Sequence, residues 1–229
     1  MINFDNSATT YPKPQSVRNA VALAVERYGG NPGRSGHELS KAAAMQVYNV
    51  REKASKLFHA EVENTAFTAN CTYALNMAIK GILQYGGHTV ISSLEHNSAS
   101  RPVYDLYKNR GVKYSIAKVE ADDEKTVENF RNLINSETKC LICTAASNVT
   151  GQITPYKELA KAAKEKGIAF ICDCAQASGV LDITLDDGMD FICTSGHKGL
   201  YGTMGTGLLI LDGKVILEDI PIQEKRQYY

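Results

Sequence analysis

Short apolar runs rich in Val, Ile and Phe recur along the chain and alternate with longer stretches of helical periodicity. Runs of this length, bounded by turn-forming residues, predict β-strands. Seven are present, at residues 65–69, 89–93, 113–119, 139–144, 168–173, 190–194 and 206–211. Helical periodicity marks residues 71–83, 101–109, 124–134 and 155–166 between them, and two more helices are predicted around 15–28 and 39–58.

Strands that alternate with helices form βαβ units, so the pattern predicts an α/β protein with three layers, α/β/α, around a seven-stranded and mostly parallel sheet. The last strand differs, because the glycine-rich connection 196–205 is too short for a crossover helix. We therefore expect it to be antiparallel, which makes the sheet mixed. Asn70 is predicted to cap the helix 71–83, and Thr154 to cap the helix that starts at Pro155.

Composition narrows the class of protein. The 229 residues include 25 basic and 25 acidic side chains, so the net charge of zero argues against nucleic acid or an anionic membrane as partners. No apolar run is long enough for a membrane span, and the polar start lacks the layout of a signal peptide. The expected location is the cytoplasm.

Six cysteines are too few for a disulfide scaffold. The pairs Cys140/Cys143 and Cys172/Cys174 have spacings that could suggest a metal site, but they lie in or beside predicted strands. Side chains alternate between faces there, whereas metal-binding Cys pairs sit on turns, so we expect buried thiols and no metal. His59 and His88 fall outside every motif and are predicted to be ordinary surface residues.

Polar side chains follow five of the predicted strands. In open parallel sheets, ligands bind beyond the carboxyl ends of the strands, so these positions should meet at one edge. They are Asn70, Cys71 and Thr72; Glu95, His96 and Asn97; Ser147 and Asn148; Asp173 and Gln176; and Ser195, Gly196, His197 and Lys198. The strand 113–119 contributes nothing comparable, as expected of an edge strand.

A lysine among glycines can form a Schiff base, and an aspartate near it can hold a protonated pyridine nitrogen. Lys198 and Asp173 therefore indicate pyridoxal phosphate. Its phosphate needs a helix N-terminus and hydroxyl groups, which the segments around Thr72 and Ser195 could supply. A nucleotide-binding loop does not fit, because Lys198 precedes the glycines at 199, 202, 205 and 207 instead of following them.

Five ordered motifs carry a family resemblance over nearly the whole chain: residues 4–10 (FDNSATT), 95–98 (EHNS), 147–151 (SNVTG), 173–176 (DCAQ) and 195–198 (SGHK). Together they resemble the class V aminotransferase family, closest to its cysteine desulfurase-like branch. The resemblance implies the large domain of a pyridoxal phosphate-dependent transferase of fold type I. Residues 34–37 are similar to a family loop near the active-site entrance.

The resemblance also implies roles for single residues. Lys198 resembles the lysine that forms a Schiff base with the cofactor, and Asp173 the partner of its pyridine nitrogen. His96 resembles the imidazole that stacks on the ring and moves protons. Asn148 and Gln176 are similar to the residues that bond the ring hydroxyl. The phosphate positions are matched by Cys71, Thr72, Ser195 and His197.

The expected domains are an N-terminal segment and entrance loop (1–37), a cofactor-binding large domain (38–212) and a tail (213–229) leading to a small domain that the sequence lacks. In the family, that domain supplies the arginine for the substrate carboxylate and the cysteine that takes the sulfur. The implied parent reaction converts L-cysteine to L-alanine and passes sulfur to an acceptor protein, in a homodimer. The alternatives are another class V aminotransferase, a selenocysteine lyase or related lyase, or a non-catalytic scaffold, and the fragment alone is expected to be inactive.

Overall fold

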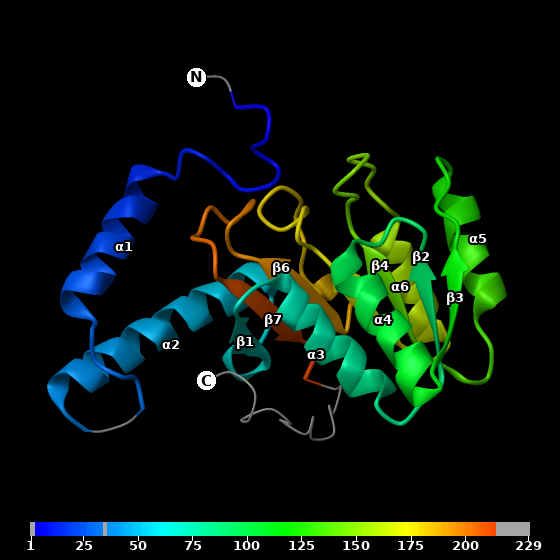
Figure 1. Cartoon of the computed structure of the whole chain (residues 1–229), viewed down its shortest axis with the longest axis horizontal. Coiled ribbons are helices and arrows are strands. Elements are labelled where there is room, and N and C mark those ends of the chain that lie inside the picture. The colour runs from blue at the N-terminus through cyan, green and yellow to red at the C-terminus, as the bar shows by residue number, and fades with distance from the viewer. Residues whose placement is uncertain (1–2, 34–35, 214–229) are drawn as a thin grey trace.

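One seven-stranded sheet forms the centre of the protein, whose computed structural model describes residues 3–33 and 36–213 (Figure 1). The strands are β1 (Thr65–Thr68), β2 (His88–Ser92), β3 (Lys113–Ala117), β4 (Thr138–Thr144), β5 (Ala169–Asp173), β6 (Phe191–Ser195) and β7 (Gly207–Leu211). Their order is β1-β7-β6-β5-β4-β2-β3. β7 is antiparallel to both of its neighbours and the other pairs are parallel, which confirms the predicted mixed sheet with residues 113–117 at an edge.

Helices cover both faces of the sheet, as the three-layer prediction requires. α3 (Cys71–Leu83) and α4 (Asn97–Arg110) pack on one face, and α5 (Asp123–Leu133) and α6 (Tyr156–Glu165) on the other (Figure 1). Short 3₁₀ turns, η1 (Val62–Asn64) and η2 (Leu185–Asp187), complete the connections. Strands β4 and β5 are buried on both faces, which explains their continuous apolar sequence.

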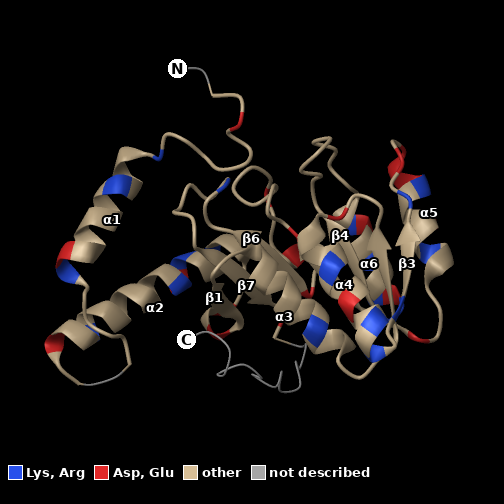
Figure 2. Ribbon diagram, in the orientation of Figure 1, with Lys and Arg blue, Asp and Glu red and all other residues tan. Residues whose placement is uncertain are grey.

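Two apolar clusters, one on each face, form the core. Leu75 and Val103 belong to the cluster under α3 and α4, and Phe130 and Leu159 to the cluster under α5 and α6. All six cysteines are free and buried, which confirms their assignment as core thiols. Figure 2 shows acidic and basic residues interspersed along the outer helices, in keeping with the zero net charge.

Two N-terminal helices, α1 (Gln15–Arg27) and α2 (Glu38–Phe58), extend away from the sheet (Figure 1). α1 contains no buried residue. The apolar face expected on α2 from Ala43, Val47, Val50, Ala54 and Leu57 is largely uncovered, since Val50 and Leu57 are each more than half exposed.

Helices α3 and α4 each begin directly after a residue whose side chain caps the helix. Asn70 caps α3 as predicted, because its Oδ1 accepts a hydrogen bond from the Tyr73 N–H at 2.9 Å. α4 begins at Asn97, four residues before the predicted start at Arg101. The reason is His96, whose Nδ1 accepts the Ser98 N–H at 3.1 Å and so caps the helix.

Thr154 does not cap α6, contrary to the prediction. The helix begins at Tyr156, with Pro155 at the cap position and no side-chain capping bond. The hydroxyl of Thr154 is buried and donates instead to the carbonyl oxygen of Thr144 at 2.7 Å. A tertiary partner therefore outcompetes the local one, which sequence periodicity does not register.

The prediction for His88 is also wrong. His88 is 3% exposed and lies in β2, where Nδ1 is 2.8 Å from the Thr138 hydroxyl and Nε2 is 3.0 Å from the Ser115 hydroxyl. Neighbouring strands supply both partners, so the polar ring is satisfied inside the sheet. His59 is exposed as expected and pairs with Asp186 at 2.6 Å.

The predicted domain boundaries at residues 37 and 212 stay predictions. Residues 214–229 of the expected tail, with the apolar side chains at 215, 216, 217, 220 and 222, lie outside the described residues, as do residues 34 and 35 of the entrance loop. Within the described part of the chain, no helix has the length and apolar character needed to cross a membrane.

Candidate active site

The carboxyl ends of the parallel strands surround a cavity of about 340 Å³. It brings together all nine residues proposed from the sequence: Cys71, Thr72, His96, Asn148, Asp173, Gln176, Ser195, His197 and Lys198. A larger cavity of about 750 Å³ lies at the opposite end of the sheet and contains none of them. The topology explains the grouping, since parallel strands end at the same edge and the connections β1–α3, β2–α4, β4–α6, β5–η2 and β6–β7 meet there.

Asp173 is the last residue of β5 and is 3% exposed. Its Oδ1 accepts hydrogen bonds from the Ala175 N–H at 2.9 Å and the Cys71 thiol at 3.4 Å. Its Oδ2 accepts a long one from the Ser98 hydroxyl at 3.5 Å. A buried carboxylate held only by neutral donors is well suited to a cationic ligand atom, such as a protonated ring nitrogen.

Two buried donors near the end of β6 lack a hydrogen-bond partner among the described residues, the Ser195 hydroxyl and His197 Nδ1. Both line the cavity together with Cys71 and Thr72, the first two residues of α3. Orphaned buried polar atoms beside a helix N-terminus are what an anion, such as a phosphate group, would satisfy. Burial and the cations Lys198 and Lys13 lower the pKa of His197, which favours the neutral ring in surroundings that would attract an anion.

Lys198 is half-buried on the loop that joins β6 to β7. The loop is tightly packed, because a Cβ at Gly199 would lie 2.3 Å from the carbonyl oxygen of Ser178. Only glycine permits this close approach. This close approach explains the glycine at 199, and the interpretation of the glycines at 199, 202, 205 and 207 as residues that let the backbone turn beside a ligand stays a prediction.

His96 presents a defined tautomer to the cavity. A backbone N–H can only donate, so the Ser98 N–H at 3.1 Å requires that Nδ1 of His96 carry no proton in the neutral ring. The Ser98 hydroxyl is 2.8 Å from the same nitrogen and can reinforce this arrangement. The proton of the neutral imidazole is therefore on Nε2, which makes the ring a proton donor through that atom.

We expect ¹⁵N spectra of histidine-labelled protein at neutral pH to show His96 with Nδ1 unprotonated and hydrogen-bonded. The Ser98 hydroxyl has one proton, which it can donate either to Nδ1 of His96 or to Asp173. Ser98→Ala removes this hydroxyl and should raise the population of the other tautomer, at a cost of up to about 1 kcal/mol in that preference. Ser100→Ala is the matched control, because in the described part of the chain the Ser100 hydroxyl bonds the carbonyl oxygen of His96, at 3.4 Å, and not its ring. Protonated Nδ1 in the wild type would contradict the assignment.

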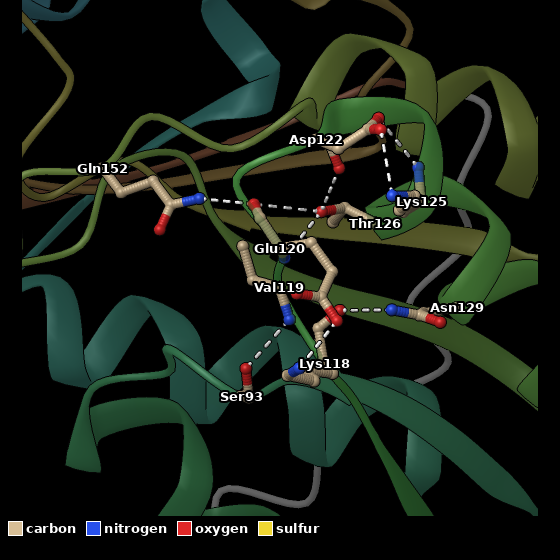
Figure 3. A network of polar contacts seen from close by, with 9 residues as sticks. All are labelled: Ser93, Lys118, Val119, Glu120, Asp122, Lys125, Thr126, Asn129 and Gln152. Carbon is tan, nitrogen blue, oxygen red and sulfur yellow. Dashed lines mark hydrogen bonds and ion pairs between the residues drawn. The ribbon is translucent and has the colours of Figure 1, made fainter.

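The loop carrying Asn148 is braced by a neighbouring loop (Figure 3). Gln152 donates from Nε2 to the Glu120 carbonyl oxygen at 2.6 Å, and the Glu120 N–H donates to the buried Thr126 hydroxyl at 2.9 Å. Within the Asn148 loop, the Ser147 N–H donates to the Gln152 carbonyl oxygen at 2.9 Å. The segment after β3 thus supports the site without contributing a side chain to it.

Sequence reasoning assigned no role to Glu95 and Ser98, although both belong to the motif EHNS at residues 95–98. Glu95 Oε1 accepts from the Ser92 hydroxyl at 2.5 Å and the Thr144 N–H at 2.7 Å, and Oε2 is buried without a partner. Burial raises the pKa of Glu95 to about 8. Glu95 therefore joins the ends of β2 and β4 directly beside His96.

Asp5, Ser7 and Ala8, which belong to the motif FDNSATT at residues 4–10, also line the cavity.

Comparison with known proteins shows the family of the chain. The family model described as Aminotransferase class-V matches residues 2–222. The chain belongs to the class V aminotransferase family. Class V aminotransferases are pyridoxal phosphate-dependent enzymes, and the seven-stranded mixed sheet is the large-domain fold of their fold type I.

The relatives and solved structures that this class V chain resembles include cysteine desulfurases. Cysteine desulfurase IscS from Clostridium botulinum (strain Hall) is 33% identical over 224 residues, which cover 96% of this chain and 55% of the relative. A probable cysteine desulfurase from Pyrococcus abyssi is 32% identical over 93% of this chain and 53% of its own length. The apo structure of a cysteine desulfurase from Thermococcus onnurineus NA1 matches with a TM-score of 0.83 at 30% identity, over 92% of this chain and 53% of that one. The chain spans about half the length of the curated relatives it matches.

Proposed function

We propose that this chain binds pyridoxal phosphate in the cavity at the strand ends and forms the cofactor-binding part of a cysteine desulfurase. The parent reaction converts L-cysteine to L-alanine and passes the sulfur to an acceptor protein. The observation that carries the proposal is the shared cavity of Lys198, the buried carboxylate of Asp173 and the unpartnered donors of Ser195 and His197. These groups match an aldehyde, a ring nitrogen and a phosphate.

The residues present fit the cofactor at each of its polar atoms. Lys198 would bond covalently to the aldehyde carbon, Asp173 would hold the ring nitrogen, and Asn148 and Gln176 would bond the ring hydroxyl. The phosphate would lie against the donors of Cys71, Thr72, Ser195 and His197. When bound, the cofactor supplies a conjugated ring that withdraws electrons from the substrate carbon attached to it.

The chain's own residues hold and move protons around that ring. Asp173 places its carboxyl group at the buried end of the site, where its oxygens accept hydrogen bonds from the Ala175 N–H, the Cys71 thiol and, at 3.5 Å, the Ser98 hydroxyl. His96 lines the cavity and can donate a proton from Nε2. The amine of Lys198 lines the same cavity and, when it is free, can accept a proton, so His96 and Lys198 together can serve as acid and base.

The six cysteines of this chain are poorly suited to take the sulfur. All are buried, and burial raises the pKa of the Cys140 thiol to about 12 and the pKa values of Cys71, Cys143, Cys172 and Cys193 as well. A thiol must ionise and be accessible to attack sulfur. We therefore assign sulfur abstraction to a cysteine outside these six, and expect the fragment alone to release no sulfide from cysteine.

The uncovered apolar surface of α1 and α2 supports a homodimer. Val25 of α1 is 81% exposed, and Met45, Tyr48 and Val50 of α2 are each about half exposed or more. Isolated helices rarely hold their shape without packing against a partner. Sedimentation analysis tests this directly, and a monomer at micromolar concentration would contradict it.

Reconstitution tests the cofactor proposal. Purified protein mixed with pyridoxal phosphate should develop an absorbance band near the visible edge, and borohydride should fix the cofactor on the peptide containing Lys198, as read by mass spectrometry. Fixation elsewhere, or none, counts against the site. Cysteine, selenocysteine and alanine offered to the longer parent protein then separate a desulfurase from a lyase or an aminotransferase.

A further inference from the structure

The N-terminal arm, residues 5–13, is bonded to the backbone of the loop that carries Lys198. Thr10 makes two of the contacts, from its N–H to the His197 carbonyl oxygen at 3.1 Å and from its hydroxyl to the Lys198 carbonyl oxygen at 2.5 Å. The hydroxyl of Thr9 and the ammonium group of Lys13 donate to the same His197 carbonyl oxygen, at 3.3 and 2.8 Å. Four donors from one short segment thus meet two adjacent carbonyls about 185 residues away in sequence.

Of these two carbonyls, that of His197 depends on the arm for its hydrogen bonds. The loop bonds itself through the Tyr201 N–H to the Lys198 carbonyl at 2.9 Å and through the Gly202 N–H to the Gly196 carbonyl at 2.6 Å. In the described part of the chain, the His197 carbonyl has no hydrogen-bond donor other than those of Thr9, Thr10 and Lys13. The bond from Lys13 is charge-assisted and therefore stronger than a neutral one.

The loop in turn holds the N-terminal arm in place. Thr10 is 8% exposed, whereas α1, which follows the arm, contains no buried residue. Asp5, Ser7 and Ala8 of the arm line the same cavity as Lys198. The arm therefore closes one side of the cavity with its first half and fastens the lysine's backbone with its second.

We infer that Thr10 and Lys13 are positioning residues that hold the backbone of Lys198 in place beneath the cavity. A lysine that reacts at a fixed point gains from a fixed backbone, because the alignment is established before the reaction. By thermodynamic linkage, the coupling is reciprocal, so whatever immobilises Lys198 also immobilises the arm. The consequence for cofactor attachment rests on the proposed function, whereas the coupling of arm and loop does not.

Amide hydrogen exchange of the chain without cofactor tests the coupling. Thr10→Val keeps the shape and the backbone N–H but removes the hydroxyl, so exchange in residues 196–202 should accelerate roughly fivefold. Thr10→Ser should restore slow exchange, and Lys13→Met should act like Thr10→Val. The matched control is Lys41→Met, because the one ion pair of Lys41 within residues 3–33 and 36–213 is with the exposed Glu38. Unchanged exchange of the loop in both arm variants would overturn the inference.

The reciprocal measurement uses pyridoxal phosphate as the probe. Its attachment to the wild type should slow exchange of the amides at residues 8–13, and Thr10→Val should slow attachment severalfold, as followed by absorbance. Attachment that leaves the arm's exchange unchanged contradicts the coupling. Failure of attachment in every variant counts against the proposed function alone, because the experiment without cofactor still decides the role of the arm.

Discussion

Lys198→Ala is expected to abolish covalent attachment of pyridoxal phosphate. The amine is the only group on the tightly packed loop 196–200 that can bond an aldehyde carbon, and Gly199 fixes that loop against Ser178. The variant should show no visible-edge absorbance band and no adduct after borohydride, and the parent protein's turnover should fall by roughly three orders of magnitude or more, as for loss of a covalent nucleophile. Absorbance and peptide mass spectrometry measure the effect.

The matched control for this variant is Lys41→Ala, an exposed lysine of α2 outside the cavity, which should keep both the band and the adduct. Circular dichroism establishes that each variant is folded. A folded Lys198→Ala protein that still fixes the cofactor with borohydride would show that another amine carries it.

Glu95 should make the protein less stable as the pH rises from about 4.5 to about 8. Burial raises the pKa of this carboxyl from 4.5 to about 8 in the folded protein, so the folded state binds a proton that the unfolded state has lost. The folded protein is most stable with respect to this group below pH 4.5. Its free energy of unfolding then falls by up to about 1.4 kcal/mol per pH unit as the pH rises to about 8, and the total loss is at most roughly 5 kcal/mol. Glu95→Gln resembles the neutral acid and lacks this decline.

Chemical denaturation at several pH values measures the difference. Wild type and Glu95→Gln should be similar at pH 5, and the variant should be the more stable by several kcal/mol at pH 8.5. Glu137→Gln is the control. Glu137 is exposed and its pKa is lowered by Lys113, so its effect on the stability of the protein changes only at pH values below about 4.5. Parallel stability curves for wild type and Glu95→Gln between pH 5 and 8.5 would exclude a neutral buried carboxyl.

The elements of the fold were predictable because each is marked locally. Apolar runs identified all seven strands to within two residues at each end, and Asn70 identified the start of α3. The order of the strands was not predictable in full. The short glycine-rich loop indicates that β7 lies antiparallel to β6, but nothing local indicates that β1 pairs on the other side of β7.

The candidate site was predictable as a set of strand ends, and the cavity contains every residue proposed for it. Burial and tertiary hydrogen bonds could not be predicted. His88 is buried because both of its hydroxyl partners come from other strands. Glu95 bonds the nearby Ser92 hydroxyl but also the Thr144 N–H of β4, a contact that only packing of the strands creates. Thr154 stands at a good capping position before α6, but its hydroxyl donates to the Thr144 carbonyl oxygen because packing brings that group within reach.

The place of β1 in the sheet bears on how the chain is synthesised. Among the described residues, β1 pairs with β7 alone, and the N-terminal arm bonds the carbonyls that follow β6. The first segments of the chain therefore find their partners near the last strands. During translation, β1 must therefore emerge from the ribosome long before its partner, with its pairing edge open. We expect nascent chains that stop before β7 to stay protease-sensitive and to bind chaperones, and the transition to a resistant state to come abruptly once β7 is free of the ribosome.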